Sequence, residues 1–282
     1  MESQARRAEA FRALHHRPKL LVLPNAWDVA SARLFEQSGF PAIATSSAGL
    51  MVSLGFPDGE EMPRRQLVAA VARIARALSV PLTADVVSGY GASVAAVVST
   101  VRQMLRAGAI GINLEDLRPS GKGLYPLPAQ VAKIRAIRQL GESLGIPLVL
   151  NARTDAYRHS PGGEPARLRE AIRRSIELRD AGADCVYPMG VSESSSIQTF
   201  VEALGCPVNV MIRPGLPPLR TLERLGVKRV SFGPAASYAA MGFLRRASRE
   251  VRERGTFRML IEGALTYEEL NSLARPAVGR GR

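Results

Sequence analysis

Two acidic side chains follow neighbouring β-rich runs of the sequence and could hold a metal ion. Asp85 comes directly after the run at 82–84, and Glu115 follows the run at 109–112. Proteins commonly hold Mg2+ with one or two carboxylates, together with waters and substrate oxygens. Helix capping or pairing with arginine would be the structural alternatives. Because both acids fall at successive predicted strand ends, the sequence favours a Mg2+ site.

An arginine and a turn of small residues could hold an anionic substrate. Arg153 follows an apolar strand, where a buried guanidinium is costly unless it is paired. It could pair with Asp155, or grip a substrate carboxylate through two parallel hydrogen bonds. The run Ser46-Ser47-Ala48-Gly49 is either a plain strand-to-helix turn or a cradle of backbone N–H groups for an anion.

Eight short apolar runs are spaced along the chain and must position these side chains. Such runs are typical of parallel strands covered on both faces. Segments with helical periodicity lie between them, as at 66–78 and 166–181. The runs are 20–23, 42–45, 82–84, 109–112, 147–150, 185–187, 208–211 and 229–232.

Eight β/α units with right-handed crossovers close most simply into a (β/α)8 TIM barrel, an α/β fold. An open doubly wound sheet is the alternative, but no Gly-x-Gly-x-x-Gly turn follows the first run. We expect the barrel over residues 1–255 and a C-terminal helical tail over 256–282. Active sites of such barrels lie at the carboxyl ends of the strands, so Asp85, Glu115 and Arg153 should share one face.

The charge and composition narrow the possible partners. The net charge is +13, but the basic residues are scattered over predicted helices without interleaved aromatics, which predicts no specific nucleic-acid partner. A basic field could still attract a small anionic carboxylate. No apolar run approaches the roughly 20 residues of a membrane span, and the first residues predict a charged helix rather than a signal segment. We expect a cytoplasmic protein without a membrane partner.

The cysteines and histidines do not suggest a further metal site. Cys185 and Cys206 have neither paired nor metal-like spacing, which is typical of small buried residues in a reduced compartment. His15, His16 and His159 do not stand at zinc-ligand spacing with carboxylates.

Five segments, in order, resemble the isocitrate lyase/phosphoenolpyruvate mutase superfamily, with its 2-methylisocitrate lyase-like and carboxyphosphonoenolpyruvate phosphonomutase-like members. They are Pro-Asn-Ala-Trp-Asp at 24–28, Thr-Ser-Ser-Ala-Gly…Ser-Leu-Gly-Phe-Pro-Asp-Gly at 45–59, Ala-Asp-Val-Val-Ser-Gly-Tyr-Gly at 84–91, Gly-Ile-Asn-Leu-Glu-Asp at 111–116 and Asn-Ala-Arg-Thr-Asp-Ala at 151–156. The resemblance implies a barrel, a Mg2+ cofactor and an enolate-like intermediate at a C–C or C–P bond. It also implies a homodimer or homotetramer that swaps its last barrel helix, a role that the tail could fill.

The resemblance also implies roles for single residues. Asp85 matches the acid that binds Mg2+ most directly, while Asp58 and Glu115 match acids that hold its waters. The turn of Ser46, Ser47 and Ala48 matches the amides that bind the substrate carboxylate. Arg153 matches the arginine that binds a second anionic group.

Two positions and one segment depart from the superfamily pattern. Val87 stands where a further metal acid is usual, and Ala44 stands where the lyases carry a tyrosine and the mutases an aromatic residue. The segment at 118–125 replaces the loop that carries the lyases' cysteine acid. Lys122, Tyr125 and Tyr187 are the available proton carriers, and the sequence does not choose between them.

The sequence therefore predicts a Mg2+-dependent lyase that makes or breaks a C–C bond in a small 2-oxo or 2-hydroxy carboxylate through a metal-stabilised enolate. A phosphonate mutase or hydrolase is the second interpretation, a barrel that binds ligand without catalysis the third, and a basic nucleic-acid binder the most distant. The predicted residues are Arg153, Lys122 and Tyr187 for catalysis, Ser46, Ser47, Ala48, Arg153 and Asn209 for substrate binding, and Asp85, Glu115 and Asp58 for the metal.

Overall fold

Parallel strands form the centre of the computed structural model, which describes residues 3–119 and 123–275. The strands are β1 (Leu21–Leu23), β2 (Asn25–Ala26), β3 (Ile43–Thr45), β4 (Leu82–Asp85), β5 (Gly111–Glu115), β6 (Val149–Thr154), β7 (Cys185–Pro188), β8 (Asn209–Met211) and β9 (Arg229–Ser231). β1 and β2 are two parts of one strand interrupted at Pro24, which has no N–H to donate. The predicted runs all become strands, although β5 and β6 begin two residues later than the runs did.

The strand pairing runs around a barrel. One sheet has the order β2-β3-β4-β5-β6-β7 and the other the order β1-β9-β8, all with parallel neighbours. β1 continues into β2, and a parallel bridge between Val186 and Val208 connects β7 to the start of β8. There the Val186 N–H donates to the Pro207 carbonyl at 3.0 Å. The predicted TIM-barrel fold is confirmed.

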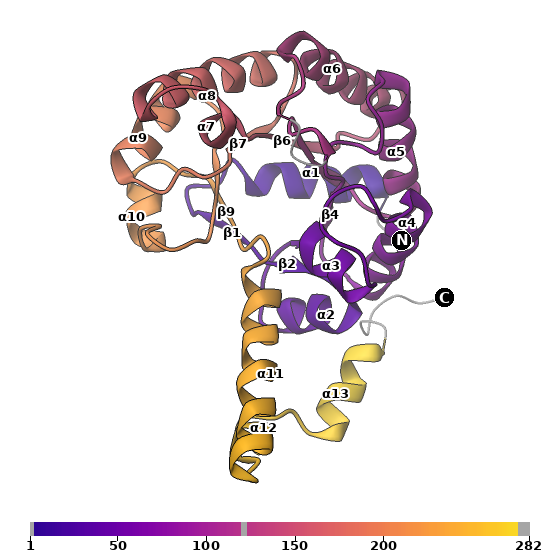
Figure 1. Ribbon diagram of the computed structural model, residues 1–282. Helices are drawn as coiled ribbons and strands as arrows, with labels where there is room; N and C mark the ends of the chain where they lie inside the picture. Colours follow the sequence, from indigo (N-terminus) through magenta and orange to yellow (C-terminus); the bar gives the residue numbers. More distant parts are fainter. Residues whose placement is uncertain (1–2, 120–122, 276–282) are drawn as a thin grey trace.

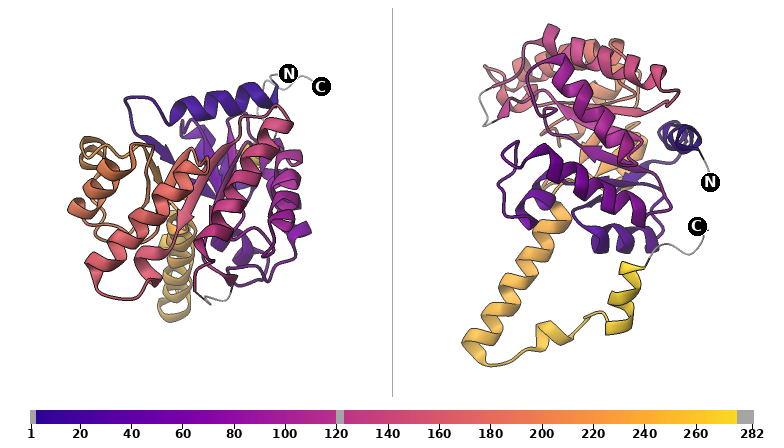
Figure 2. Two further views of the ribbon diagram at one scale, coloured as in Figure 1. Left: turned by 90° about the horizontal axis from the view of Figure 1, so that it is seen from above. Right: turned by 90° about the vertical axis from the view of Figure 1, so that its right-hand side faces the viewer.

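Helices cover the outside of the strands (Figures 1 and 2). In α4, Leu67, Val71 and Ile74 repeat at helical spacing and are buried against the barrel. α9 ends where Gly205 adopts the left-handed conformation, just before Pro207. The helices between the strands are α2 (Val29–Gln37), α3 (Ser47–Ser53), α4 (Arg64–Ala77), α5 (Val94–Arg106), α6 (Leu127–Ser143), α7 (Ala156–His159), α8 (Glu164–Asp180), α9 (Ser194–Leu204) and α10 (Leu219–Arg224).

Helix α1 (Gln4–Leu14) covers the amino ends of the strands. The Gln4 side chain donates to the carbonyls of Leu105 and Ala109, just before β5. Phe11 is fully buried and lies so close to Gly111 that a Cβ there would stand 2.8 Å from its ring. The floor of the barrel is therefore closed, and its opening lies at the carboxyl ends of the strands.

A C-terminal arm leaves the barrel after β9. α11 (Ala235–Arg254) projects away from the barrel, and its buried residues are Ser237 and Ala247 (Figure 1). After α12 (Arg258–Ile261), the chain turns back and α13 (Tyr267–Ala274) packs against α2. Residues 276–282 of the predicted tail lie outside the described residues. Among the described helices, none has the length and apolar content needed to cross a bilayer.

Candidate active site

A cavity of about 330 Å³ opens at the carboxyl ends of the strands. It lies at the face that the sequence predicted, and most of the predicted site residues line it. These are Ser46, Ser47, Ala48, Asp58, Asp85, Arg153, Tyr187 and Asn209. Glu115 is not among the lining residues, and Lys122 lies outside the described residues.

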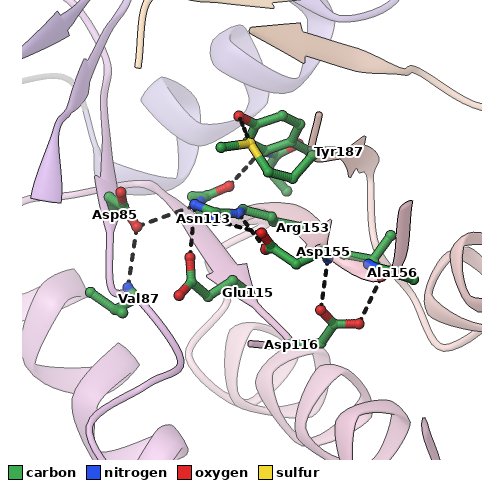
Figure 3. A network of polar contacts seen from close by, with 12 residues as sticks. Asp85, Val87, Asn113, Glu115, Asp116, Arg153, Asp155, Ala156 and Tyr187 are labelled. Carbon is green, nitrogen blue, oxygen red and sulfur yellow. Dashed lines mark hydrogen bonds and ion pairs between the residues drawn. The ribbon is translucent and has the colours of Figure 1, made fainter. Parts of the chain in front are cut away.

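Backbone and amide donors hold the Asp85 carboxylate in place at the end of β4. Oδ1 accepts from the Val87 N–H at 3.1 Å and from Asn113 Nδ2 at 3.2 Å (Figure 3). Oδ2 lies 3.4 Å from the Ser47 N–H. Val87 has a φ of 54°, which is rare for a β-branched residue and turns its N–H back toward Asp85. Position 87 therefore supports Asp85 through its backbone rather than through an acidic side chain.

The small-residue turn begins helix α3 beside this carboxylate. Ser46 caps the helix, because its Oγ accepts from the Gly49 N–H at 3.2 Å. Ser47 and Ala48 form the first turn of α3 and line the cavity. Asp58 lies near this turn. Burial raises its pKa most and the charge of Asp85 raises it further, whereas a hydrogen bond with the Ser47 side chain lowers it.

Arg153 is already paired with two carboxylates. Its Nη1 is 2.8 Å from Glu115 Oε2, and its Nε and Nη2 donate to the Asp155 carboxylate at 2.7 and 2.9 Å (Figure 3). Arg153 thus forms the ion pair with Asp155 that the sequence offered as one of its two possible contacts. Burial raises the pKa of Glu115, Arg153 opposes that rise, and the charges of Asp155, Asp85 and Asp58 add to it.

The charges of the site fit a divalent cation. Beyond the effect of burial, the charges of Asp155, Asp85 and Asp58 raise the pKa of Glu115, and the charge of Arg153 opposes them. In the described ranges, no three acidic, histidine or cysteine side chains lie close enough to enclose a metal on their own. Mg2+ retains waters and substrate oxygens, so the donor set suits that ion. Asp85 would hold it directly, and Asp58 through water.

Two asparagines support Asp85 from deeper in the barrel. Asn151 Nδ2 donates to Asn113 Oδ1 at 2.7 Å, and Asn113 in turn donates to Asp85. The role of Asn113 was not predicted from the sequence. The available signal was its inward position, two residues before Glu115, in an otherwise apolar strand.

The remaining predicted groups have different surroundings. The buried Tyr187 hydroxyl donates to Met189 Sδ at 2.9 Å, and burial raises the pKa of this tyrosine above its ordinary value. Tyr125 does not line the cavity, because its ring lies against Lys133, whose Nζ is 3.4 Å from the ring centre. Asn209 donates to Ser231 Oγ at 3.1 Å. Of the three proton carriers considered, Tyr187 is therefore the one in the described residues that reaches the cavity.

A buried network fixes the edge of the site next to Arg153. Asp116 accepts from Thr154 Oγ1 at 2.7 Å and from the Asp155 N–H at 2.9 Å. Arg174 of α8 donates to the same carboxylate at 3.1 Å and to the Tyr125 carbonyl. Asp116 thus orients Asp155, which orients Arg153.

Known proteins are similar in sequence to this chain over most of its length. An uncharacterized protein of Mycobacterium tuberculosis is 34% identical over 244 residues, which are 86% of this chain and 89% of the relative. The 2-methylisocitrate lyase of Escherichia coli is 30% identical, covering 93% of this chain and 90% of the relative. The chloroplastic carboxyvinyl-carboxyphosphonate phosphorylmutase of Arabidopsis thaliana is also 30% identical, covering 95% and 81%.

Solved structures share the fold and lead to the same family. A protein of Burkholderia cenocepacia J2315 has a TM-score of 0.88 and 38% identity over 95% of both chains. Oxaloacetate acetylhydrolase bound to oxalate has a TM-score of 0.84 and 26% identity, covering 97% of this chain and 95% of the other. 2,3-Dimethylmalate lyase, a PEP mutase/isocitrate lyase superfamily member, has a TM-score of 0.82 and 26% identity, covering 95% and 94%. Because residues 11–252 also match the phosphoenolpyruvate phosphomutase family model, the chain belongs to that family, within the PEP mutase/isocitrate lyase superfamily.

Proposed function

We propose that this enzyme is a Mg2+-dependent carbon–carbon lyase for a small 2-oxo or 2-hydroxy carboxylate. The observation that carries the proposal is the position of Asp85 and Asp58 beside the first turn of α3, so close together that the charge of Asp85 raises the pKa of Asp58. Mg2+ bound there would supply Lewis-acid stabilisation of the negative charge that develops on the C2 oxygen. The relatives named 2-methylisocitrate lyase and 2,3-dimethylmalate lyase support lyase chemistry.

The predicted site residues that line the cavity would bind, orient or protonate the substrate. The N–H groups of Ser47 and Ala48 would donate to the substrate carboxylate beside Asp85, as helix N-termini do for anions. Arg153, held by Glu115 and Asp155, would orient a second oxygen-bearing group of the substrate. Asn209 would contact the substrate from β8, and Tyr187 would carry a proton.

A phosphonate mutase is the second candidate function. It is favoured by the phosphoenolpyruvate phosphomutase family model and by the Arabidopsis relative named as a phosphorylmutase. The cavity would serve such a substrate through the same Asp85 and the same α3 amides. Turnover of a phosphonate without turnover of any 2-oxo or 2-hydroxy acid would decide for this candidate.

The test measures Mg2+ binding by titration calorimetry, with and without oxalate as a mimic of the enolate. Oxalate should tighten Mg2+ binding in the wild type and lose that effect in Asp85→Asn, which keeps the shape but removes the charge. A parallel screen of 2-oxo acids, 2-hydroxy acids and phosphonates identifies the reaction. If oxalate binds equally well without metal, and Asp85→Asn changes nothing, the metal-enolate mechanism is wrong. Binding without any turnover would instead support a barrel that has lost catalysis.

A further inference from the structure

A second set of polar side chains lines the cavity below the acids of the metal site. Each stands two residues before a cavity-lining residue on its strand, so each lies one step deeper in the barrel. Each is no more than 2% exposed and carries one atom without a hydrogen bond among the described residues. These atoms are Thr83 Oγ1, Asn151 Oδ1, Asn209 Oδ1 and Arg229 Nε. Since buried polar groups are normally paired, this deep part of the cavity suits a polar ligand.

Arg229 brings a positive charge without a carboxylate partner into this deep part of the cavity. Across residues 3–119 and 123–275, no carboxylate forms an ion pair with it. Its Nη1 lies 3.5 Å from His15 Nε2, and His15 Nδ1 lies 3.0 Å from the Phe11 carbonyl. His15 therefore carries its proton on Nδ1 and turns a neutral lone pair toward Arg229. A buried guanidinium with only this neutral partner is costly unless an anion joins it.

The two arginines of the inner barrel differ in the charge that they can offer a ligand. Arg153 is held by the carboxylates of Glu115 and Asp155, at 2.8 and 2.7 Å. Burial lowers the pKa of Arg229, and among the described carboxylates Asp85 is the one whose more distant charge opposes that effect. An additional negative group on a substrate therefore gains more from Arg229 than from Arg153.

We propose that Arg229 forms a deep subsite for a distal carboxylate of the substrate. The 2-oxo or 2-hydroxy end would bind beside Asp85, as the proposed function requires, and the tail carboxylate would point down the barrel to Arg229. Asp85 and Arg229 line the same cavity. The free oxygens of Thr83, Asn151 and Asn209 would accept hydrogen bonds from hydroxyl groups or waters along the way. Arg229 thus selects for the length and charge of the tail, and Asp85 for the reacting end.

Matched pairs of acids test this subsite. 2-Hydroxybutyrate and malate share a reacting end and differ by a methyl or a carboxylate at the tail, as do 2-hydroxyvalerate and 2-hydroxyglutarate. Calorimetry at saturating Mg2+ should show at least one tail carboxylate binding roughly 10- to 100-fold more tightly than its methyl partner in the wild type. In Arg229→Met that preference should fall to about one, and Arg229→Lys should keep part of it. Arg249→Met removes the same charge from an exposed site on α11 and should keep the preference.

Oxalate separates this subsite from the proposed function, because its two directly bonded carboxylates mimic the reacting end and it carries no tail. Arg229→Met should keep the wild-type response to oxalate and Mg2+, which also shows that the variant is folded. Equal binding of methyl and carboxylate tails by the wild type, or a preference that survives in Arg229→Met, overturns the subsite. If the preference depends on Arg229 but not on Mg2+, the subsite stands and the metal-dependent function fails.

Discussion

The Glu115 carboxylate and the Arg153 guanidinium face each other across neighbouring strands, 2.8 Å apart, with side chains that are 10% and 16% exposed. They occupy directly paired positions of β5 and β6. The sequence predicted Glu115 as a metal acid and Arg153 as a substrate-binding residue. Their contact makes each the other's partner, so Glu115 can tune the charge of the site without lining the cavity.

Removing the arginine of this pair should destabilise the fold. Arg153→Met leaves Glu115 and Asp155 as buried carboxylates without their cation, and such a change commonly costs about 3–5 kcal/mol. Glu115→Gln should cost less, because Arg153 keeps Asp155. Urea denaturation measures both, with the exposed Arg173→Met as the control. Equal stability of Arg153→Met and wild type would show that the pair contributes nothing.

The metal proposal ranks two acids. Asp85→Asn should lower kcat/KM at least tenfold more than Asp58→Asn, because Asp85 would be the direct ligand and Asp58 would act through water. Loss of a supporting group typically costs 10- to 100-fold, which sets the scale for Asp58→Asn. Steady-state assays at several Mg2+ concentrations check the ranking. A larger defect in Asp58→Asn would exchange the two roles.

Acid should destabilise the protein through His15. Burial, followed by the charge of Arg229, lowers the pKa of His15 from 6.5 to about 3. Between those two pH values, His15 is protonated in the unfolded chain but neutral in the folded protein. The contribution of His15 to the free energy of unfolding is therefore fully present above pH 6.5 and is lost as pH falls toward 3. The loss from pH 7 to pH 5 should be about 2 kcal/mol.

His15→Gln should show a correspondingly flatter acid limb than the wild type in denaturation at each pH. The exposed His159→Gln is the control and should follow the wild type. If His15→Gln loses stability on acidification as steeply as the wild type, then His15 does not contribute to the acid limb.

The turn that supports Asp85 should not tolerate a side chain at Gly89. Gly89 has a φ of 106°, and a Cβ there would lie 2.7 and 2.9 Å from the Val97 methyl groups. Gly89→Ala should therefore cost about 1–3 kcal/mol from overpacking, in addition to backbone strain. Gly39→Ala isolates the strain, since Gly39 has a φ of 86° and open space around it. Thermal or urea unfolding checks the difference, and equal losses would exclude the contact with Val97.

The exposed arm should make the protein a homo-oligomer. Large apolar side chains on α11 and in the following segment are exposed, among them Tyr238, Met241, Phe257 and Ile261. Such a patch is typical of a protein interface. Light scattering should give a mass of at least twice 30.4 kDa. The double change Leu260→Glu and Ile261→Glu should lower it, and Gln198→Glu with Thr199→Glu on α9 should not. A monomeric wild type would contradict this prediction.

Much of the architecture could be predicted from the sequence, because it depends on local pattern. Short apolar runs separated by helical periodicity and Pro-containing joints can form parallel strands under helices, and all the predicted runs became strands. The acids and the arginine that follow those strands had to reach one face, since parallel strands end together. The two-part first strand at Pro24 and the departure of α11 were not evident, because both depend on what packs beside them.

The identity of each partner was decided only by the tertiary structure. Nothing within β5 or β6 says that Glu115 lies opposite Arg153, because the register between strands depends on the whole barrel. The same holds for Arg229 and His15, which are 214 residues apart and meet where α1 closes the barrel floor. The sequence determined which chemical groups are present and toward which end of the barrel they point. Folding decided which charges compensate one another, because burial makes the energy of a charge depend on its nearest neighbours.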